Sequence, residues 1–188
     1  MADYMSGVID IGGAINANIV GELLEAIDAD KGTMDWGGDY FQSREELEQQ
    51  ATEYEQLRIL NDEAPYGRLE TIEDFCVNHN IPFDRWSDSK YEYDCCWVKW
   101  RPGMENAHVI CSNKNYEELV SIDLLERADD FLEQVRSGVG LGDDAWPALD
   151  DLRREIADAM GSDIVPLLPF TIEDFSDTRT NRFRQSGS

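Results

Sequence analysis

The chain has 188 residues and a formal net charge of −24, with 40 acidic and 16 basic side chains. A charge of this sign repels nucleic acid and anionic membrane and attracts basic protein surfaces, so direct binding to a phosphate backbone is disfavoured. The hydrophobic content of 41% is too high for a disordered chain and predicts one domain with a buried core. No apolar run reaches the length of a membrane span and no signal peptide is evident, so we expect a cytoplasmic protein without membrane contact.

The first half of the chain predicts short strands that alternate with helices. Strands are expected over residues 7–11 and 57–60, and helices over residues 18–29, 43–55 and 69–79. Asn16 or Asn18 is the expected N-cap of the first helix. Ser43 and Glu46 have the spacing of a capping box at the start of the second. After Pro82 we expect an extended passage that leads into a polar loop.

The second half predicts a hairpin, two helices and an extended segment. Strands are expected over residues 91–100, 107–111 and 119–122, helices between 122 and 160, and an edge strand or extended segment over 164–172. The pentapeptide Thr-Ile-Glu-Asp-Phe at residues 71–75 recurs at 171–175, and we interpret both copies as helix starts. These elements predict a single α+β domain over residues 1–175, with a small, largely antiparallel sheet covered by amphipathic acidic helices. Residues 176–188 are polar and basic and are expected to form a disordered tail.

The two helices expected between Ile122 and Met160 each separate apolar from acidic side chains. At helical spacing, the apolar residues of each helix fall within one arc and the carboxylates fall within the opposite arc. Residues 137–142 are rich in glycine and interrupt this pattern. The helices are therefore predicted to be neighbours that are joined by a short connection.

The acidic stripes of these helices are the candidate binding site. Carboxylates three or four residues apart on a helix are separated by about 4.5 to 6 Å along its axis, close to the spacing of about 6 to 7 Å between successive phosphates of a nucleic-acid strand. Two such stripes would imitate a phosphate track and occupy a basic groove built for DNA or RNA. The candidate partner-binding residues are Glu126, Asp130 and Glu133 in the first helix, Asp143, Asp144, Asp150, Asp151, Glu155 and Asp158 in the second, and Glu45, Glu46 and Glu48 near residue 43.

A zinc site is an alternative interpretation of the cysteines and histidines. Cys76 with His79, and His108 with Cys111, have the spacing of zinc ligands. However, residues three apart in a strand point to opposite faces, so His108 and Cys111 cannot share one ion without a bend. We therefore expect buried, reduced thiols and neither a metal nor a cofactor.

A metal-dependent nuclease is another alternative. Asp88-Ser89-Lys90, with Asp74 or Asp84 upstream, has the outline of the acid-x-lysine site used in phosphodiester cleavage. The triplet is expected to lie in a polar turn instead of at a strand end, and the net charge of the chain would repel the substrate. Neither a nucleophilic triad nor a phosphate-binding loop is supported, so the sequence favours a protein that is not an enzyme.

The segment that begins with Phe83-Asp84-Arg85 and ends with Tyr91-Glu92-Tyr93-Asp94 resembles a stretch in accessory proteins of phages and mobile elements. In size, acidity and α+β composition the chain is similar to the DNA-mimic antirestriction proteins and anti-CRISPR proteins of this kind. The resemblance implies a partner with a positively charged nucleic-acid channel, such as a CRISPR effector or a restriction enzyme, in the cytoplasm of a host cell. It implies no particular site residues.

Two alternatives to mimicry would also account for the acidity of the chain, and both stay open. Acid-rich helix faces are usually only solvated faces, and proteins adapted to high salt also combine many Asp with few Lys. The rival function is an acidic adaptor or regulatory protein that binds through an apolar edge near residues 164–170, with its charge serving solubility. The oligomeric state does not follow from the sequence, and a homodimer is left open.

Overall fold

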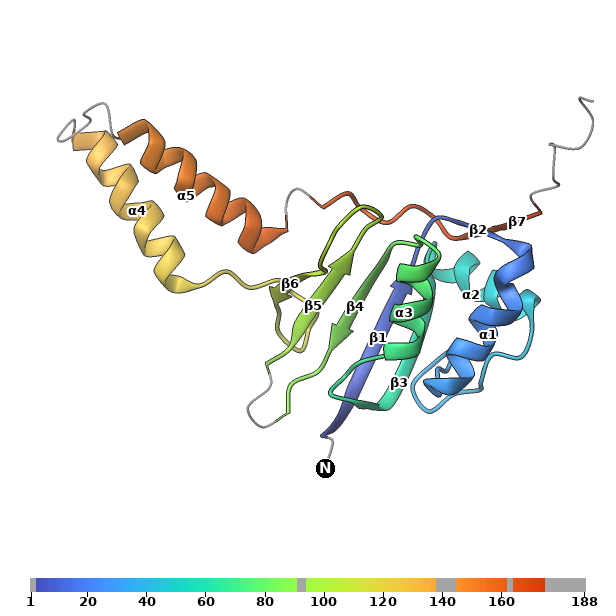
Figure 1. Ribbon diagram of the computed structural model, residues 1–188. Helices are drawn as coiled ribbons and strands as arrows, with labels where there is room; N and C mark the ends of the chain where they lie inside the picture. The colour runs from blue at the N-terminus through green and yellow to red at the C-terminus, as the bar shows by residue number, and fades with distance from the viewer. Residues whose placement is uncertain (1–2, 91–93, 138–144, 162–163, 175–188) are drawn as a thin grey trace, which may run out of the picture.

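The structure is a computed structural model that describes residues 3–90, 94–137, 145–161 and 164–174. Its centre is a five-stranded sheet in which all neighbouring strands are antiparallel (Figure 1). From edge to edge the strands are β3 (Leu57–Pro65), β1 (Tyr4–Ile11), β4 (Phe83–Ser87), β5 (Cys96–Trp100) and β6 (His108–Cys111). The predicted α+β class with a largely antiparallel sheet is confirmed.

The alternation of side chains in β1 sets the two faces of the sheet. Ile9 and Ile11 are buried in the larger hydrophobic core on one face of the sheet, which we call the main core. Val8 belongs to a smaller hydrophobic cluster on the opposite face. The strand expected over residues 7–11 is therefore confirmed. It begins earlier than expected, at Tyr4.

β4 differs from the expected passage into a loop. It forms the strand between β1 and β5, although Asp84 and Arg85 at its centre are charged. Both charges have partners, because Arg101 Nη1 lies 2.7 Å from Asp84 Oδ1 and Arg85 Nε lies 2.9 Å from Glu73 Oε1. A pattern of apolar residues does not reveal a strand whose charges are neutralised by residues distant in the sequence.

Two helices cover one face of the sheet. α1 (Val20–Ala29), which follows the 3-10 turn η1 (Ala17–Ile19), packs beside α3 (Glu70–Asn78) over the strands (Figure 1). The predicted cap lies on the 3-10 turn and not on α1. Asn16 Oδ1 accepts a hydrogen bond from the Asn18 amide at 2.9 Å, whereas Ile19 is at the N-cap position of α1. The main core between these helices and the sheet includes Ile9, Ile11, Leu23, Ile27, Leu57, Ile59, Ile72, Phe75, Phe83 and Trp100.

α2 (Arg44–Tyr54) closes the β3 edge of the sheet. The predicted capping box is confirmed, because Ser43 Oγ accepts a hydrogen bond from the Glu46 amide and the Glu46 carboxylate accepts one from the Ser43 amide. The buried Gln50 side chain donates to the Arg58 carbonyl at 3.2 Å. An open edge strand leaves backbone groups unpaired, and this bond satisfies one carbonyl of the β3 edge.

Residues 164–174, which we call the strap, run along one end of the sheet (Figure 1). Within the strap, β7 (Thr171–Glu173) pairs in parallel with β2 (Ala14–Asn16), and Phe170 is buried in the main core. A Cβ atom at Gly12 would lie 2.5 Å from the Leu168 carbonyl oxygen, so the strap approaches this closely only because residue 12 is glycine. The extended segment expected over residues 164–172 is confirmed.

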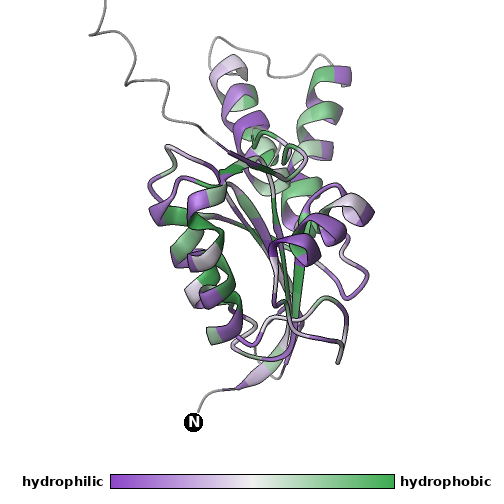
Figure 2. Ribbon diagram, turned by 90° about the vertical axis from the view of Figure 1, so that its right-hand side faces the viewer, coloured by the Kyte–Doolittle hydropathy of each residue, from purple (hydrophilic) through white to green (hydrophobic). Residues whose placement is uncertain are grey.

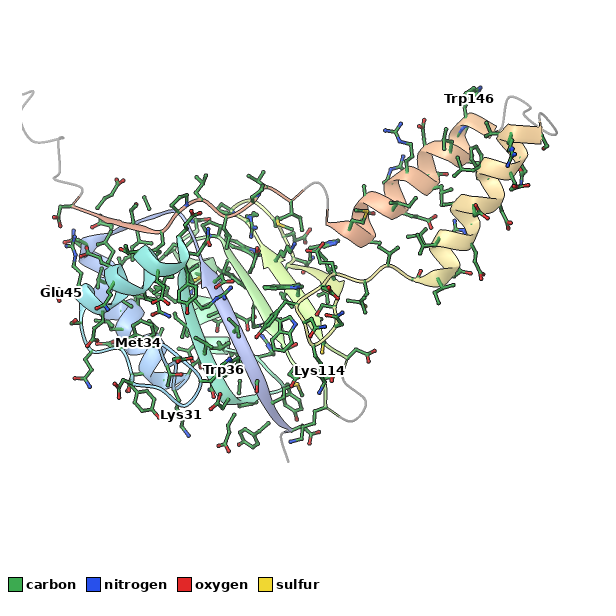
Figure 3. All side chains as sticks on the ribbon, turned by 180° about the vertical axis from the view of Figure 1, so that it is seen from behind. Lys31, Met34, Trp36, Glu45, Lys114 and Trp146 are labelled. Carbon is green, nitrogen blue, oxygen red and sulfur yellow. The ribbon has the colours of Figure 1, made fainter. Side chains whose placement is uncertain are left out.

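α4 (Ile122–Ser137) and α5 (Ala145–Met160) form a helical hairpin that projects beyond the β6 edge (Figures 1 and 3). The two expected acidic helices are neighbours, as predicted, but the helices that cover the sheet are α1 and α3. The strand expected over residues 119–122 is wrong, because Ser121 caps α4 by accepting a hydrogen bond from the Leu124 amide at 3.2 Å. None of the described helices is long and apolar enough to cross a membrane. The tail expected over 176–188 lies outside the described residues.

Candidate acidic interface

The contacts between α4 and α5 fix the register of the hairpin. Leu124 of α4 and Leu152 of α5 are buried, and Arg127 donates two hydrogen bonds to the Glu155 carboxylate, at 2.6 and 3.1 Å. Arg127 is the sixth residue of α4, and Glu155 is the sixth residue from the end of α5. The start of α4 and the end of α5 therefore lie at the same level, next to the body.

The carboxylates of α4 form a row that faces away from α5. Asp123, Glu126, Asp130 and Glu133 follow one another at intervals of three or four residues, so they share one side of the helix, opposite Leu124. All four side chains are exposed. Because a helix rises 1.5 Å per residue, this set, which we call the α4 row, is about 15 Å long.

The carboxylates of α5 lie on the other flank of the hairpin. Asp150, Asp151 and Asp158 are exposed and lie on the side of α5 that faces away from α4. The acidic residues of the two helices therefore face in opposite directions and do not form one surface. Asp151 is also paired with an arginine, since Arg154 Nη1 lies 2.9 Å from its Oδ1.

The three remaining candidates of the second helix are Glu155, Asp143 and Asp144. Glu155 is held by Arg127, whose hydrogen bond to the carboxylate lowers the pKa of Glu155 below its ordinary value. This carboxylate is bound within the hairpin, although the sequence pattern placed it on the outward face. Asp143 and Asp144 lie outside the described residues.

The candidates on α2 are remote from the hairpin. Figure 3 labels Glu45 at one end of the molecule and Trp146 of α5 at the other. The Glu46 carboxylate is occupied by the Ser43 amide in the capping box, and Glu48 Oε1 lies 2.8 Å from Arg44 Nε. The acidic residues of α2 therefore do not extend the acidic flanks of α4 and α5.

The hairpin also exposes apolar side chains that the sequence pattern predicted to be buried. Leu132 and Trp146 are 64% and 66% exposed, and Leu125 and Met160 are 55% and 47% exposed. Figure 2 shows hydrophobic segments in the projecting helices as well as in the sheet. Each apolar arc is wider than the contact between two helices, and no third layer covers the remainder among the described residues. In the sequence, the width of the apolar arcs on these two adjacent helices was the signal that could have predicted a second contact surface.

The residues of the zinc alternative lie apart. His79 Nε2 lies 3.0 Å from Glu22 Oε1, and His108 Nε2 donates to the Asp158 carbonyl at 2.6 Å. Cys76 is buried in the main core, and burial raises the pKa of its thiol. In the part of the chain that the structure describes, no group of three His, Cys, Asp or Glu side chains is placed to hold a metal ion.

The residues of the nuclease alternative also point to separate partners. The triplet 88–90 directly follows β4, so the expectation that it lies away from a strand end is wrong. However, Lys90 Nζ donates to the Tyr4 carbonyl at 2.7 Å, while Asp88 Oδ1 accepts a hydrogen bond from the Ser89 amide. Asp84 is paired with Arg101. The lysine and the two carboxylates thus do not converge on a common point.

Cys96 and Cys111 are directly opposite each other on β5 and β6. One step along the ladder, the Ser112 amide donates to the carbonyl of the facing Cys95 at 3.0 Å. Hydrogen-bonded and non-hydrogen-bonded pairs alternate in an antiparallel ladder, so Cys96 and Cys111 form a non-hydrogen-bonded pair with Cα atoms about 4.5 Å apart. This separation is compatible with a disulfide.

Incubation of the purified protein with glutathione disulfide is expected to join Cys96 to Cys111 and to release two molecules of glutathione. The exposed Cys111 thiol should react first, and Cys96 should then displace glutathione from it. Mass spectrometry of a non-reduced digest detects the crosslinked peptides. The buried Cys76 should stay reduced and serves as the internal control. The assigned register would be contradicted if the wild type formed no Cys96–Cys111 disulfide. It would also be contradicted if Cys96 still formed an intramolecular disulfide in a Cys111→Ser variant.

Comparison of the chain with protein-family models, with curated proteins and with solved structures finds no match.

Proposed function

We propose that this protein is a non-enzymatic inhibitor that occupies the basic nucleic-acid-binding surface of a defence complex, such as a CRISPR effector or a restriction enzyme. The α4 row is the observation that carries the proposal. Among the described residues no ion pair engages Asp123, Glu126 or Asp130, and Glu133 has one exposed contact of 3.9 Å to Arg136. These carboxylates are therefore available to an external cation.

The spacing of the α4 row suits a surface that binds phosphates. Its carboxylates are separated by about 4.5 to 6 Å along the helix, and successive phosphates of a nucleic-acid strand by about 6 to 7 Å. Arginine and lysine side chains that bind successive phosphates can adjust to this difference in spacing. Binding would release counterions from the row and from the basic groove, as nucleic-acid binding does. The net charge of −24 would steer the protein to a basic partner.

Reversal of three charges in the row tests this proposal. Glu126→Lys, Asp130→Lys and Glu133→Lys, made together, are expected to weaken inhibition about 100-fold, because each exposed ion pair contributes about 1 kcal/mol. The measurement is DNA cleavage by a panel of purified CRISPR effectors and restriction enzymes at increasing concentrations of the protein. For the enzyme that is inhibited, the apparent affinity should fall steeply as salt is raised.

A matched variant separates the position of the charges from their number. Glu25→Lys, Asp28→Lys and Glu53→Lys change the net charge by the same amount on exposed positions of α1 and α2, away from the hairpin. This variant should retain nearly all of its inhibition. If both variants lose activity equally, the row has no special role, and if no member of the panel is inhibited, the proposed function is wrong.

An adaptor that binds through apolar side chains is the second candidate function. It is favoured by Val165 and Leu168 of the strap, which are each 66% exposed although the strap backbone is fixed to the body. Such an adaptor would bind its partner equally well after reversal of the α4 row. Its affinity would also change little with salt, because apolar contacts are not screened.

A further inference from the structure

The hairpin has a second surface, which the proposed function does not use. The Arg127–Glu155 pair marks one face of the layer formed by α4 and α5. Helical spacing places Leu125 and Leu132 of α4, and Trp146 and Met160 of α5, on the opposite face, because these positions lie on the other side of the seam. We call this set the apolar hairpin face. Trp146 is at the tip of the hairpin (Figure 3).

Two side chains of opposite charge, Asp129 and Arg153, lie along the apolar hairpin face at the same height. Asp129 is the eighth residue of α4 and borders the face, while Arg153 is the eighth residue from the end of α5 and lies within it. The register set by Arg127 and Glu155 therefore puts them at equal heights, about 10 Å from the body end. Both side chains are exposed, and neither has an ion-pair partner among the described residues.

We infer that two copies of this chain associate through the apolar hairpin face and form a four-helix bundle with both bodies at the same end. A two-fold interface requires a surface that is complementary to itself. With the axis along the hairpin, α4 of one copy lies over α5 of the other, and the two helices run antiparallel. Asp129 then lies level with the partner's Arg153, and this pair occurs twice.

The size of the face suits a dimer of moderate affinity. Each helix has 16 residues and is therefore about 24 Å long, and two adjacent helices with side chains are about 20 Å wide. The footprint is about 500 Å² per copy, or about 1,000 Å² in total, which is the lower limit of a specific interface. An exposed apolar patch of several hundred Å² marks a contact surface in an otherwise polar molecule.

The charge of the whole chain gives this dimer a diagnostic salt dependence. Each copy carries a net charge of −24, so the two bodies repel each other when they lie at the same end of the bundle. Salt screens this repulsion and does not weaken the apolar contact. Dimerisation should therefore tighten with rising salt, whereas binding of the α4 row to a basic partner should weaken. The dimer does not depend on the proposed function.

Sedimentation equilibrium of the full chain tests the inference. The wild type is expected to dimerise with a Kd in the micromolar range, and more tightly at about 0.5 M than at about 0.05 M NaCl. Arg153→Asp should weaken the dimer at least 10-fold, because two identical pairs become like-charged. Asp129→Arg combined with Arg153→Asp should restore most of the affinity, since the pair is then reversed.

Arg154→Asp is the matched control. It makes the same change of charge at the next residue, which lies on the outer flank beside Asp151, and should leave the dimer intact. Helicity measured by circular dichroism verifies that each variant remains folded. A wild type that stays monomeric at about 0.5 mM in high salt overturns the inference. A dimer equally sensitive to Arg153→Asp and Arg154→Asp, or a double variant without recovery, also overturns it.

Discussion

Replacement of Arg85 by methionine is expected to lower the free energy of unfolding by about 3 to 5 kcal/mol, because it leaves a buried carboxylate without its cation. Arg85 and Glu73 are only 5% and 8% exposed. Arg85 Nε lies 2.9 Å from Glu73 Oε1, although its N–H does not point at a hydrogen-bond acceptor. Arg85 Nη1 donates to the Gly67 carbonyl at 3.0 Å. The pair therefore joins α3 to β4 mainly through the attraction of two desolvated charges.

The stability lost on replacement of Arg85 by methionine is expected to be larger at higher pH. Burial raises the pKa of Glu73 above its ordinary value of 4.5, and the charge of Arg85 opposes this shift. The folded state thus binds the Glu73 proton more tightly than the unfolded chain, so stability decreases as pH rises from the unfolded-state pKa through the folded-state pKa. Without Arg85 this decrease should be steeper. Urea unfolding at about pH 5 and about pH 8 should show the larger loss at the higher pH.

An exposed pair and a double variant test the origin of this effect. Arg154→Met removes a pair that is exposed on α5, and should cost at most about 1 kcal/mol. Arg85→Met combined with Glu73→Leu removes both buried charges and should recover much of the lost stability. If the single Arg85 variant is equally destabilised at both pH values, the cost arises from packing and not from the buried charge of Glu73.

Alanine at position 12 is expected to destabilise the protein by about 1 to 3 kcal/mol. The added Cβ would lie 2.5 Å from the Leu168 carbonyl oxygen and 2.9 Å from Leu167 Cβ. The strap would have to move away, and the hydrogen bond from the Gly13 amide to Leu168 at 3.1 Å would be lost. Thermal unfolding measures the loss of stability, and limited proteolysis reports whether the strap has become accessible.

The same substitution at position 21 is the matched control. Gly21 is in the first turn of α1, and a Cβ there would meet nothing within 4 Å. Alanine is a better helix former than glycine, so Gly21→Ala should stabilise the protein by about 0.5 to 1 kcal/mol. Opposite signs are therefore expected for one chemical change, and a Gly12→Ala variant as stable as the wild type would contradict the close approach of the strap to residue 12.

The elements that were predicted correctly have local signals in the sequence. The capping box at Ser43 and the apolar periodicity of α3 involve only residues within a few positions of one another. The pentapeptide Thr-Ile-Glu-Asp-Phe shows where such signals stop. At residues 71–75 it lies in α3, as expected, but the first three residues of its second copy form β7. The expectation of a second helix start is wrong because pairing with β2 determines the conformation there.

The candidate site was also predictable in part, because some of its features depend only on residues that are close together in the sequence. Helical spacing identifies which carboxylates of α4 share a side, and the row that contains Glu126 and Asp130 follows from it. Spacing within one helix does not give the orientation of a neighbouring helix. The Arg127–Glu155 contact and the buried Leu124 and Leu152 supply that orientation. Only with these contacts does it follow that the two acidic flanks diverge and that an apolar face remains between them.

The parallel pairing of β2 with β7 has a consequence for the order of folding. Ala14 and Thr171 are 157 residues apart, so a ribosome must release almost the whole described chain before this pair can form. Until then the place of Phe170 in the core is unfilled, and the amide and carbonyl of Gly13 lack their hydrogen-bond partners in the strap, Leu168 and Thr171. Completion of the domain is therefore a late event in synthesis, and chains that stop before the strap should be readily recognised by chaperones and proteases.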